Sequence, residues 1–173
     1  MSPVQPCDVP LNSFLSRYKA GAGFADCYVT EVPGEITQAA FIEAFYTSPL
    51  FKVERTILKF LVAKPATDAD ARQLASGSST TFSAWSVEDR SLSELLLADL
   101  NGYTRSWLMV SPVGQNGGSP STLLYFGSAV VPRQRAGAQK PSMGWLFHAL
   151  LGFHRLYSRL LLRAASNRVR PTA

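Results

Sequence analysis

The longest helical pattern of the chain lies near its C-terminus, over residues 144–165. Apolar residues recur there at spacings of three, four and seven positions, which places them on one face of a helix. We expect five of them to be buried against a sheet: Leu146, Leu150, Phe153, Tyr157 and Leu160. Further apolar residues widen this face, so the helix is predicted to pack on more than one neighbour, as it would inside a curling sheet.

Upstream patterns predict three shorter helices and five strands. The helices follow from their caps and stops: one begins after Thr37, a second begins at Ser48-Pro49 and ends at Pro65, and a third covers residues 68–75 and stops at Gly77. Alternating polarity predicts strands over residues 25–32, 82–89, 93–99, 103–110 and 122–131. The expected fold class is α+β, with one antiparallel sheet packed against the C-terminal helix.

Asn101-Gly102 is the strongest local turn signal, because a two-residue type I′ turn requires a positive φ at both central residues. Such a turn sets the register of the two strands that it joins. The expected pairs are Leu96 with Trp107, Glu94 with Met109 and Ala98 with Arg105. Both faces of this ribbon carry apolar residues, so we expect the sheet to be covered on one face and at least partly on the other. A partner subunit is one candidate for the second cover.

Composition and charge narrow the class of protein. With 173 residues, 46% of them hydrophobic and 17% charged, the chain is long and apolar enough for one packed domain. We place that domain at residues 25–166, after an N-terminal extension over 1–24 and before a basic tail over 167–173. The net charge of +5 is concentrated after residue 132. We interpret it as a solvated helix edge with a basic loop and tail, and we expect no nucleic-acid partner.

Cysteine and hydropathy patterns bear on location. Cys7 and Cys27 form no CxxC motif, and no secretory signal precedes them. The most apolar window, residues 145–162, contains two histidines and two arginines, which argues against a membrane span. We therefore expect a cytoplasmic protein with free thiols.

No catalytic, cofactor or metal motif is present in the sequence. His148 and His154 lie six positions apart on one helix, whereas a helical zinc pair needs a spacing of about four. Residues 114–118 are rich in glycine but lack the lysine and the following helix of a phosphate-binding loop. We expect no metal and no cofactor.

Arg105 is the most suggestive polar residue, since it lies among aromatic residues on otherwise apolar strands. A buried arginine beside aromatic rings can hold a carboxylate or phosphate in an apolar pocket. The predicted ligand-binding residues are Trp85, Arg105, Trp107 and Tyr125, with the loop over residues 111–121 near the mouth. Alternatively, the stem of Arg105 lies along Trp107 and its charged head reaches water.

The order of these elements is a strand, paired helices, four antiparallel strands and a long C-terminal helix. This order resembles the helix-grip fold of the START-like superfamily over residues 24–165. The resemblance implies a curved antiparallel sheet that grips the C-terminal helix, with a ligand cavity between them. The ending over residues 150–164, with its Phe153-His154-Arg155 step, also resembles the uncharacterised bacterial DUF2867 family.

Three functions remain open at this point. The first is the binding of a hydrophobic or aromatic small molecule between the sheet and the C-terminal helix. The second is a cyclase or hydratase type of enzyme, with Glu94 or Asp99 as general base and Arg105 or Tyr125 polarising a carbonyl. The third is an obligate homodimer with a structural role and no pocket, for which strands that are apolar on both faces are equally good evidence.

Overall fold

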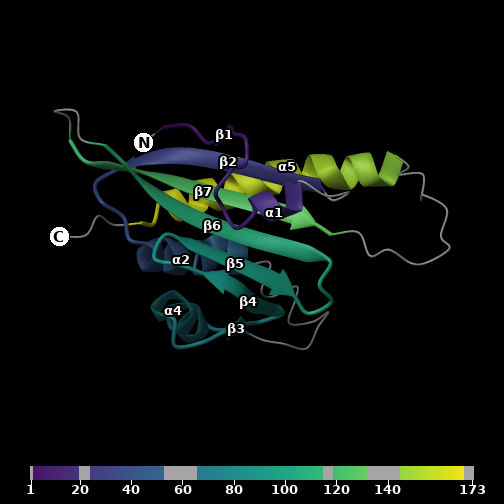
Figure 1. Cartoon of the computed structure of the whole chain (residues 1–173), viewed down its shortest axis with the longest axis horizontal. Coiled ribbons are helices and arrows are strands. Elements are labelled where there is room, and N and C mark those ends of the chain that lie inside the picture. The colour runs from purple at the N-terminus through teal and green to yellow at the C-terminus, as the bar shows by residue number, and fades with distance from the viewer. Residues whose placement is uncertain (1, 20–23, 53–65, 115–118, 132–144, 170–173) are drawn as a thin grey trace.

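Seven antiparallel strands form one open sheet, in the order β1-β2-β7-β6-β5-β4-β3, within the part of the chain that this computed structural model describes (Figure 1). That part comprises residues 2–19, 24–52, 66–114, 119–131 and 145–169, with side chains of the last helix from His154 onward. The strands are β1 (Gln5–Pro6), β2 (Phe24–Pro33), β3 (Thr81–Phe82), β4 (Trp85–Arg90), β5 (Glu94–Asp99), β6 (Thr104–Val113) and β7 (Ser121–Val130). The helices are α1 (Ser16–Lys19), α2 (Gln38–Tyr46), α4 (Asp68–Ser76) and α5 (Trp145–Ser166). The predicted α+β class is confirmed.

Thr37 and Gly77 bound the shorter helices as predicted, and Thr67 adds a cap that we did not predict. The Thr37 side chain accepts a hydrogen bond from the Ala40 N–H at the start of α2. A reciprocal capping box between Thr67 and Asp70 begins α4, and Gly77, with a φ of 80°, ends it. The predicted helix after Ser48 begins as expected, since residues 49–52 are helical, and its continuation to Pro65 lies outside the described residues.

The β5–β6 hairpin has the predicted register but not the predicted turn. Leu96 pairs with Trp107, and the other two expected pairs are also present. Only Gly102 of the turn dipeptide has a positive φ, at 72°, so the type I′ turn at Asn101-Gly102 is wrong. The loop between the strands covers residues 100–103 and is two residues longer than the predicted dipeptide. Its turn closes where the Gly102 N–H donates to the Asp99 carbonyl. One residue is added on each side of the dipeptide, so the pairing is unchanged.

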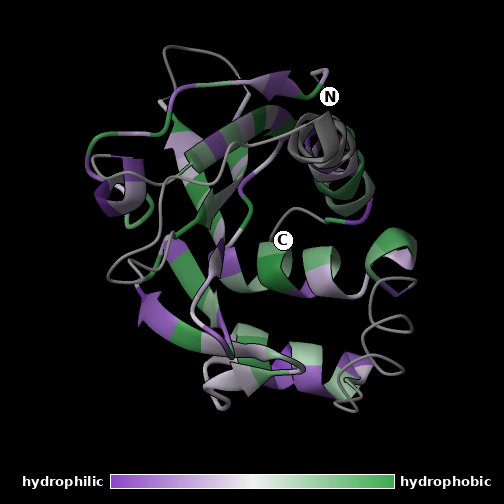
Figure 2. Ribbon diagram, turned by 90° about the vertical axis from the view of Figure 1, so that its right-hand side faces the viewer, coloured by the Kyte–Doolittle hydropathy of each residue, from purple (hydrophilic) through white to green (hydrophobic). Residues whose placement is uncertain are grey.

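Two separate hydrophobic clusters cover the two faces of the sheet. The larger one lies between the sheet and the helices α2, α4 and α5, and includes Leu95, Leu97, Leu108, Leu124 and Phe126. The smaller one lies between the opposite face and the N-terminal segment, and includes Val9, Leu15, Leu96, Trp107 and Ala129. Figure 2 shows the sheet from the side, between these two covers. The helices and the N-terminal segment thus bury both faces within one chain.

The segment that we predicted as an N-terminal extension is therefore part of this packing, as far as the structure describes it. Leu15 is fully buried, and Val9 is almost so. Cys7 lies beside Cys27 of β2, with 3.1 Å between the two sulfurs, and both are free thiols. The second face of the sheet is covered without a partner subunit.

α5 buries a face that differs in part from the one we predicted. Leu160 is 45% exposed, so its predicted burial is wrong, whereas Leu161, Leu162 and Ala165 are buried. Tyr157 packs against the core as expected. The side chains of Leu146, Leu150 and Phe153 lie outside the described residues. The buried face is shifted because α5 packs against α2 as well as against β2 and β7. Among the described helices, none is long and apolar enough to cross a membrane.

Gly127 tests how closely β7 is packed against β2 and the N-terminal segment. A Cβ at this position of β7 would lie 2.4 Å from Leu15 Cδ2 and 2.8 Å from the Asp26 carbonyl oxygen. We expect Gly127→Ala to lower the free energy of unfolding by about 1–3 kcal/mol or more, measured by urea denaturation, because the backbone oxygen cannot move aside cheaply. Gly114→Ala is the matched control, since nothing lies within 4 Å of its Cβ position. Equal stabilities of the two variants would show that Leu15 and the Asp26 carbonyl do not pack this closely on β7.

Candidate functional site

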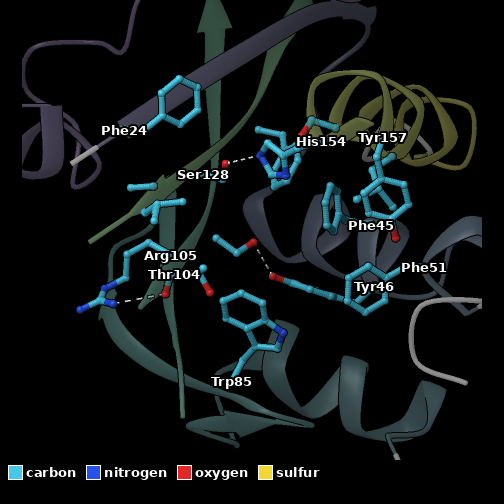
Figure 3. Close-up of a pocket in the computed structure, with 16 residues that line it drawn as sticks. Phe24, Phe45, Tyr46, Phe51, Trp85, Thr104, Arg105, Ser128, His154 and Tyr157 are labelled. Atoms are coloured by element: carbon cyan, nitrogen blue, oxygen red, sulfur yellow. Dashed lines mark hydrogen bonds between the residues drawn. The ribbon is translucent and has the colours of Figure 1, made fainter. Parts of the chain in front are cut away.

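A cavity of about 410 Å³ lies between the helix-covered face of the sheet and the helices α2 and α5 (Figure 3). Its size falls within the range of about 300–1,000 Å³ that is usual for small-molecule sites. The lining residues are Phe24, Phe45, Tyr46, Phe51, Trp85, Thr104, Arg105, Ser106, Phe126, Ser128, Ala129, Val130, His154, Tyr157, Ser158 and Leu161. Most of this wall is apolar or aromatic.

Phe45 is the centre of the aromatic wall. Its ring centroid lies 4.8 Å from that of Phe126, 5.1 Å from that of Tyr46 and 5.9 Å from that of Phe51. The helical spacing of α2 brings Phe41 and Phe45 to the same side, where they make an edge-to-face contact. The packing of α2 on the sheet thus gives the cavity a rigid aromatic side.

One end of the cavity is polar, because three residues from three elements meet there. Ser128 of β7 lies directly opposite Asp26 of β2 in the register, and its Oγ is 2.6 Å from Asp26 Oδ1. His154 of α5 places its Nε2 2.7 Å from Ser128 Oγ and 3.6 Å from Asp26 Oδ2. Figure 3 shows the imidazole at the cavity wall, directed toward Ser128.

The direction of these hydrogen bonds follows from the donors available. The Ser128 hydroxyl donates its only hydrogen to Asp26, so it accepts a hydrogen bond from His154 Nε2–H. Burial opposes the ionisation of Asp26, but the interactions with His154 and Ser128 outweigh it and lower the pKa of this carboxyl group. Tyr28 also donates to Asp26, and burial raises the pKa of its phenol to about 12. The series of hydrogen bonds from His154 through Ser128 therefore ends on the Asp26 carboxylate.

Further hydroxyl groups lie on the cavity wall. Tyr46 Oη and Ser106 Oγ are 3.5 Å apart. Ser158 follows His154 by one helical turn, and its hydroxyl is buried without a hydrogen-bond partner among the described residues. An unpaired buried hydroxyl costs about 1–3 kcal/mol, which a bound polar atom could offset.

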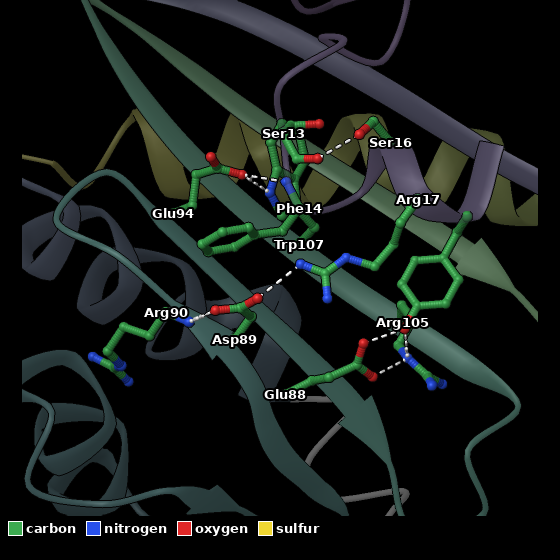
Figure 4. Close-up of polar contacts among 11 residues, drawn as sticks. Ser13, Phe14, Ser16, Arg17, Glu88, Asp89, Arg90, Glu94, Arg105 and Trp107 are labelled. Atoms are coloured by element: carbon green, nitrogen blue, oxygen red, sulfur yellow. Dashed lines mark hydrogen bonds and ion pairs between the residues drawn. The ribbon is translucent and has the colours of Figure 1, made fainter. Parts of the chain in front are cut away.

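The structure separates the four predicted ligand-binding residues. Trp85 lines the cavity. Arg105 also contributes to the lining, but Figure 3 shows its guanidinium directed away from the cavity. That group contacts Glu88 at 2.5 Å and Tyr18 Oη at 3.1 Å on the opposite face (Figure 4). Arg105 is thus held by protein partners and is not offered to a ligand in this cavity.

Trp107 and Tyr125 belong to the cluster under the N-terminal segment, on the face opposite the cavity. Trp107 donates its indole N–H to Glu94 Oε2 at 2.8 Å, and the Phe14 backbone N–H donates to the same oxygen (Figure 4). Glu94, one of the proposed general bases, therefore has a structural role here. The other, Asp99, accepts the backbone N–H of Thr104 in the hairpin loop.

The loop over residues 111–121 lies away from the cavity in its described part. The cavity uses residues 104–106 of β6 and 128–130 of β7, while the loop joins the other ends of these strands. The separation along β6 is roughly 20 Å, at about 3.3 Å per strand residue.

Asp26, Ser128 and His154 were not among the predicted site residues. The sequence contained one signal for this site. Asp26 shares a strand face with Tyr28 and Val32, which are both buried, and a carboxylate on such a face needs a partner. His154 belongs to the Phe153-His154-Arg155 step named in the sequence analysis. Their meeting depends on the pairing of β2 with β7, which local patterns do not show.

The described residues contain no group of three histidine, cysteine or acidic side chains placed to hold a metal ion. A scan against protein-family models finds no match, and searches of curated proteins and of solved structures also find none. Inference about function therefore rests on the cavity itself.

Proposed function

We propose that this protein binds a hydrophobic or aromatic small molecule in the cavity between the sheet and helices α2 and α5. The observation that carries the proposal is a cavity of about 410 Å³ with an aromatic wall and one polar end, formed by His154 and Ser128. Apolar walls supply affinity, and a few placed polar groups orient a ligand.

The order of elements supports this function. A strand, a helical pair, a run of antiparallel strands and a long final helix is the order of the helix-grip fold, in which the ligand lies between the sheet and that helix. Membership of the START-like superfamily, and of the DUF2867 family, is part of the proposal. So is a cytoplasmic location, for which the two free thiols are the supporting observation.

The homodimer alternative loses its main support. It was motivated by strands that are apolar on both faces, and the N-terminal segment covers the second face within one chain. A homodimer without a pocket also does not account for the cavity and its polar end.

A fluorescent dye tests the proposal directly. We expect 1-anilinonaphthalene-8-sulfonate to bind the folded protein with increased emission, because its rings enter an apolar site. Ser106→Leu should weaken this binding about tenfold, which corresponds to about 1.4 kcal/mol, since the new side chain fills part of the cavity.

Ser111→Leu is the matched control, with the same substitution on the same strand and on the opposite face. Its affinity should equal that of the unmodified protein, and circular dichroism should show both variants folded. Equal affinities of the two variants, or no binding by the folded protein, would contradict the proposal.

A further inference from the structure

We propose that the cavity is a site of proton transfer, in which His154 removes a proton from a carbon next to the carbonyl group of a bound apolar ketone. The inference rests on the proposed function, because the ketone is the class of ligand that it assigns to the same cavity. Three observations carry it: the anchored imidazole, the carboxylate behind it and the hydroxyl groups on the wall.

The imidazole is held through its Nε2 atom. Its Nε2 donates to Ser128, while Nδ1 has no hydrogen bond to any described residue. The side chain of His154 is 40% exposed and lines the cavity, so it is accessible to a ligand. Because Nε2 carries the proton, Nδ1 of the neutral ring has a lone pair and can act as a base.

The carboxylate of Asp26 lies behind that base. When Nδ1 takes up a proton, the ring becomes an imidazolium, and Ser128 connects it to Asp26, which also lies 3.6 Å from Nε2. A buried carboxylate that orients a histidine and stabilises its cation is a recurrent device of general base catalysis. Ser128 is a positioning residue in this arrangement, because its proton is already donated to Asp26.

The carbonyl group is required because a histidine cannot remove a proton from an ordinary C–H bond. A carbonyl next to the carbon accepts the electron pair and becomes an enolate oxygen, which hydrogen-bond donors stabilise. Ser158, whose buried hydroxyl is unpaired among the described residues, lies one turn from His154 on the same helix. The Tyr46 and Ser106 hydroxyls lie on the same cavity wall.

The step balances without an oxidant or a reductant. The C–H bond breaks, its proton goes to Nδ1 and its electron pair enters the enolate. Return of the proton to the same carbon restores the ketone. In an enone, return to the far carbon of the conjugated system moves the double bond.

The same contacts also connect α5 to the sheet, so a structural role must be separated from a catalytic one. His154→Gln does this, because the glutamine amide nitrogen can take the place of Nε2 and donate to Ser128. An amide cannot take up a proton as imidazole does. This variant should keep the stability of the unmodified protein while losing the base.

The experiment measures hydrogen–deuterium exchange at the carbons next to the carbonyl of 2-tetralone in D₂O by proton NMR. Binding of 2-tetralone is measured in parallel by displacement of 1-anilinonaphthalene-8-sulfonate. We expect the protein to accelerate exchange over buffer, and His154→Gln to lower the accelerated rate about 100-fold when both proteins are saturated with 2-tetralone.

Each outcome has a defined meaning. Binding without acceleration overturns the proton-transfer inference and leaves the proposed function standing. Equal acceleration by His154→Gln overturns the role of His154. Absence of binding by the folded protein to both dye and ketone overturns the proposed function, and the inference with it.

Discussion

Replacement of Trp107 with alanine is expected to lower the free energy of unfolding by about 3–5 kcal/mol, measured by urea denaturation. The side chain is fully buried in the cluster that joins the sheet to the N-terminal segment. Its loss leaves a cavity and also removes one of the two donors to Glu94, which is 9% exposed. A buried carboxylate that loses a donor adds to the cost, which places this variant toward the upper end of the range.

Trp85→Ala is the matched control for this prediction. Trp85 is only partly buried and lines the cavity on the other face, so its truncation should cost less stability and should change dye binding. Trp107→Ala should leave dye affinity unchanged in the folded protein. A weaker effect at Trp107 than at Trp85 would contradict the division of the molecule into two clusters.

The sheet and the caps could be predicted because their signals are local. Alternating polarity identified the five long strands, and Thr37 and Gly77 marked helix ends through their own side-chain or backbone chemistry. The register around Leu96 and Trp107 was also correct, although the loop is longer than the Asn101-Gly102 dipeptide. A loop that grows by one residue on each side leaves the pairing unchanged.

The cover provided by the N-terminal segment could not be predicted in this way. β1 has two residues and α1 has four, which is too short for either to show a period. The segment packs through single residues such as Leu15 and through hydrogen bonds such as that from the Phe14 N–H to Glu94. Such contacts join positions 80 residues apart in the chain.

The partner of Arg105 depends on an irregularity of the sheet. The β4–β5 register shifts between Val87 and Asp89, so Glu88 lies at a bulge. A bulge redirects a side chain out of simple alternation, and Glu88 forms the ion pair with Arg105. Alternation alone does not predict this pair. In the same way, Asp26 and Ser128 meet only through the pairing of β2 with β7.

The orientation of α5 decides which of its leucines stabilise the protein. Leu162 is fully buried in the larger cluster, whereas Leu160, two positions earlier, is 45% exposed. We expect Leu162→Ala to lower the free energy of unfolding by about 2–5 kcal/mol, because it removes buried methyl groups and leaves a cavity. Leu160→Ala should change it by no more than about 0.5 kcal/mol, as is usual for surface positions.

Both variants carry the same substitution on the same helix, so intrinsic helix propensity cancels in the comparison. The difference between their free energies of unfolding, measured by urea denaturation under identical conditions, therefore reports which of the two leucines α5 turns toward the core. From the sequence, we predicted that Leu160 is buried against the sheet. A larger loss at Leu160 than at Leu162 would show that α5 is rotated, and His154 would then lie on a different side of the helix, away from Ser128.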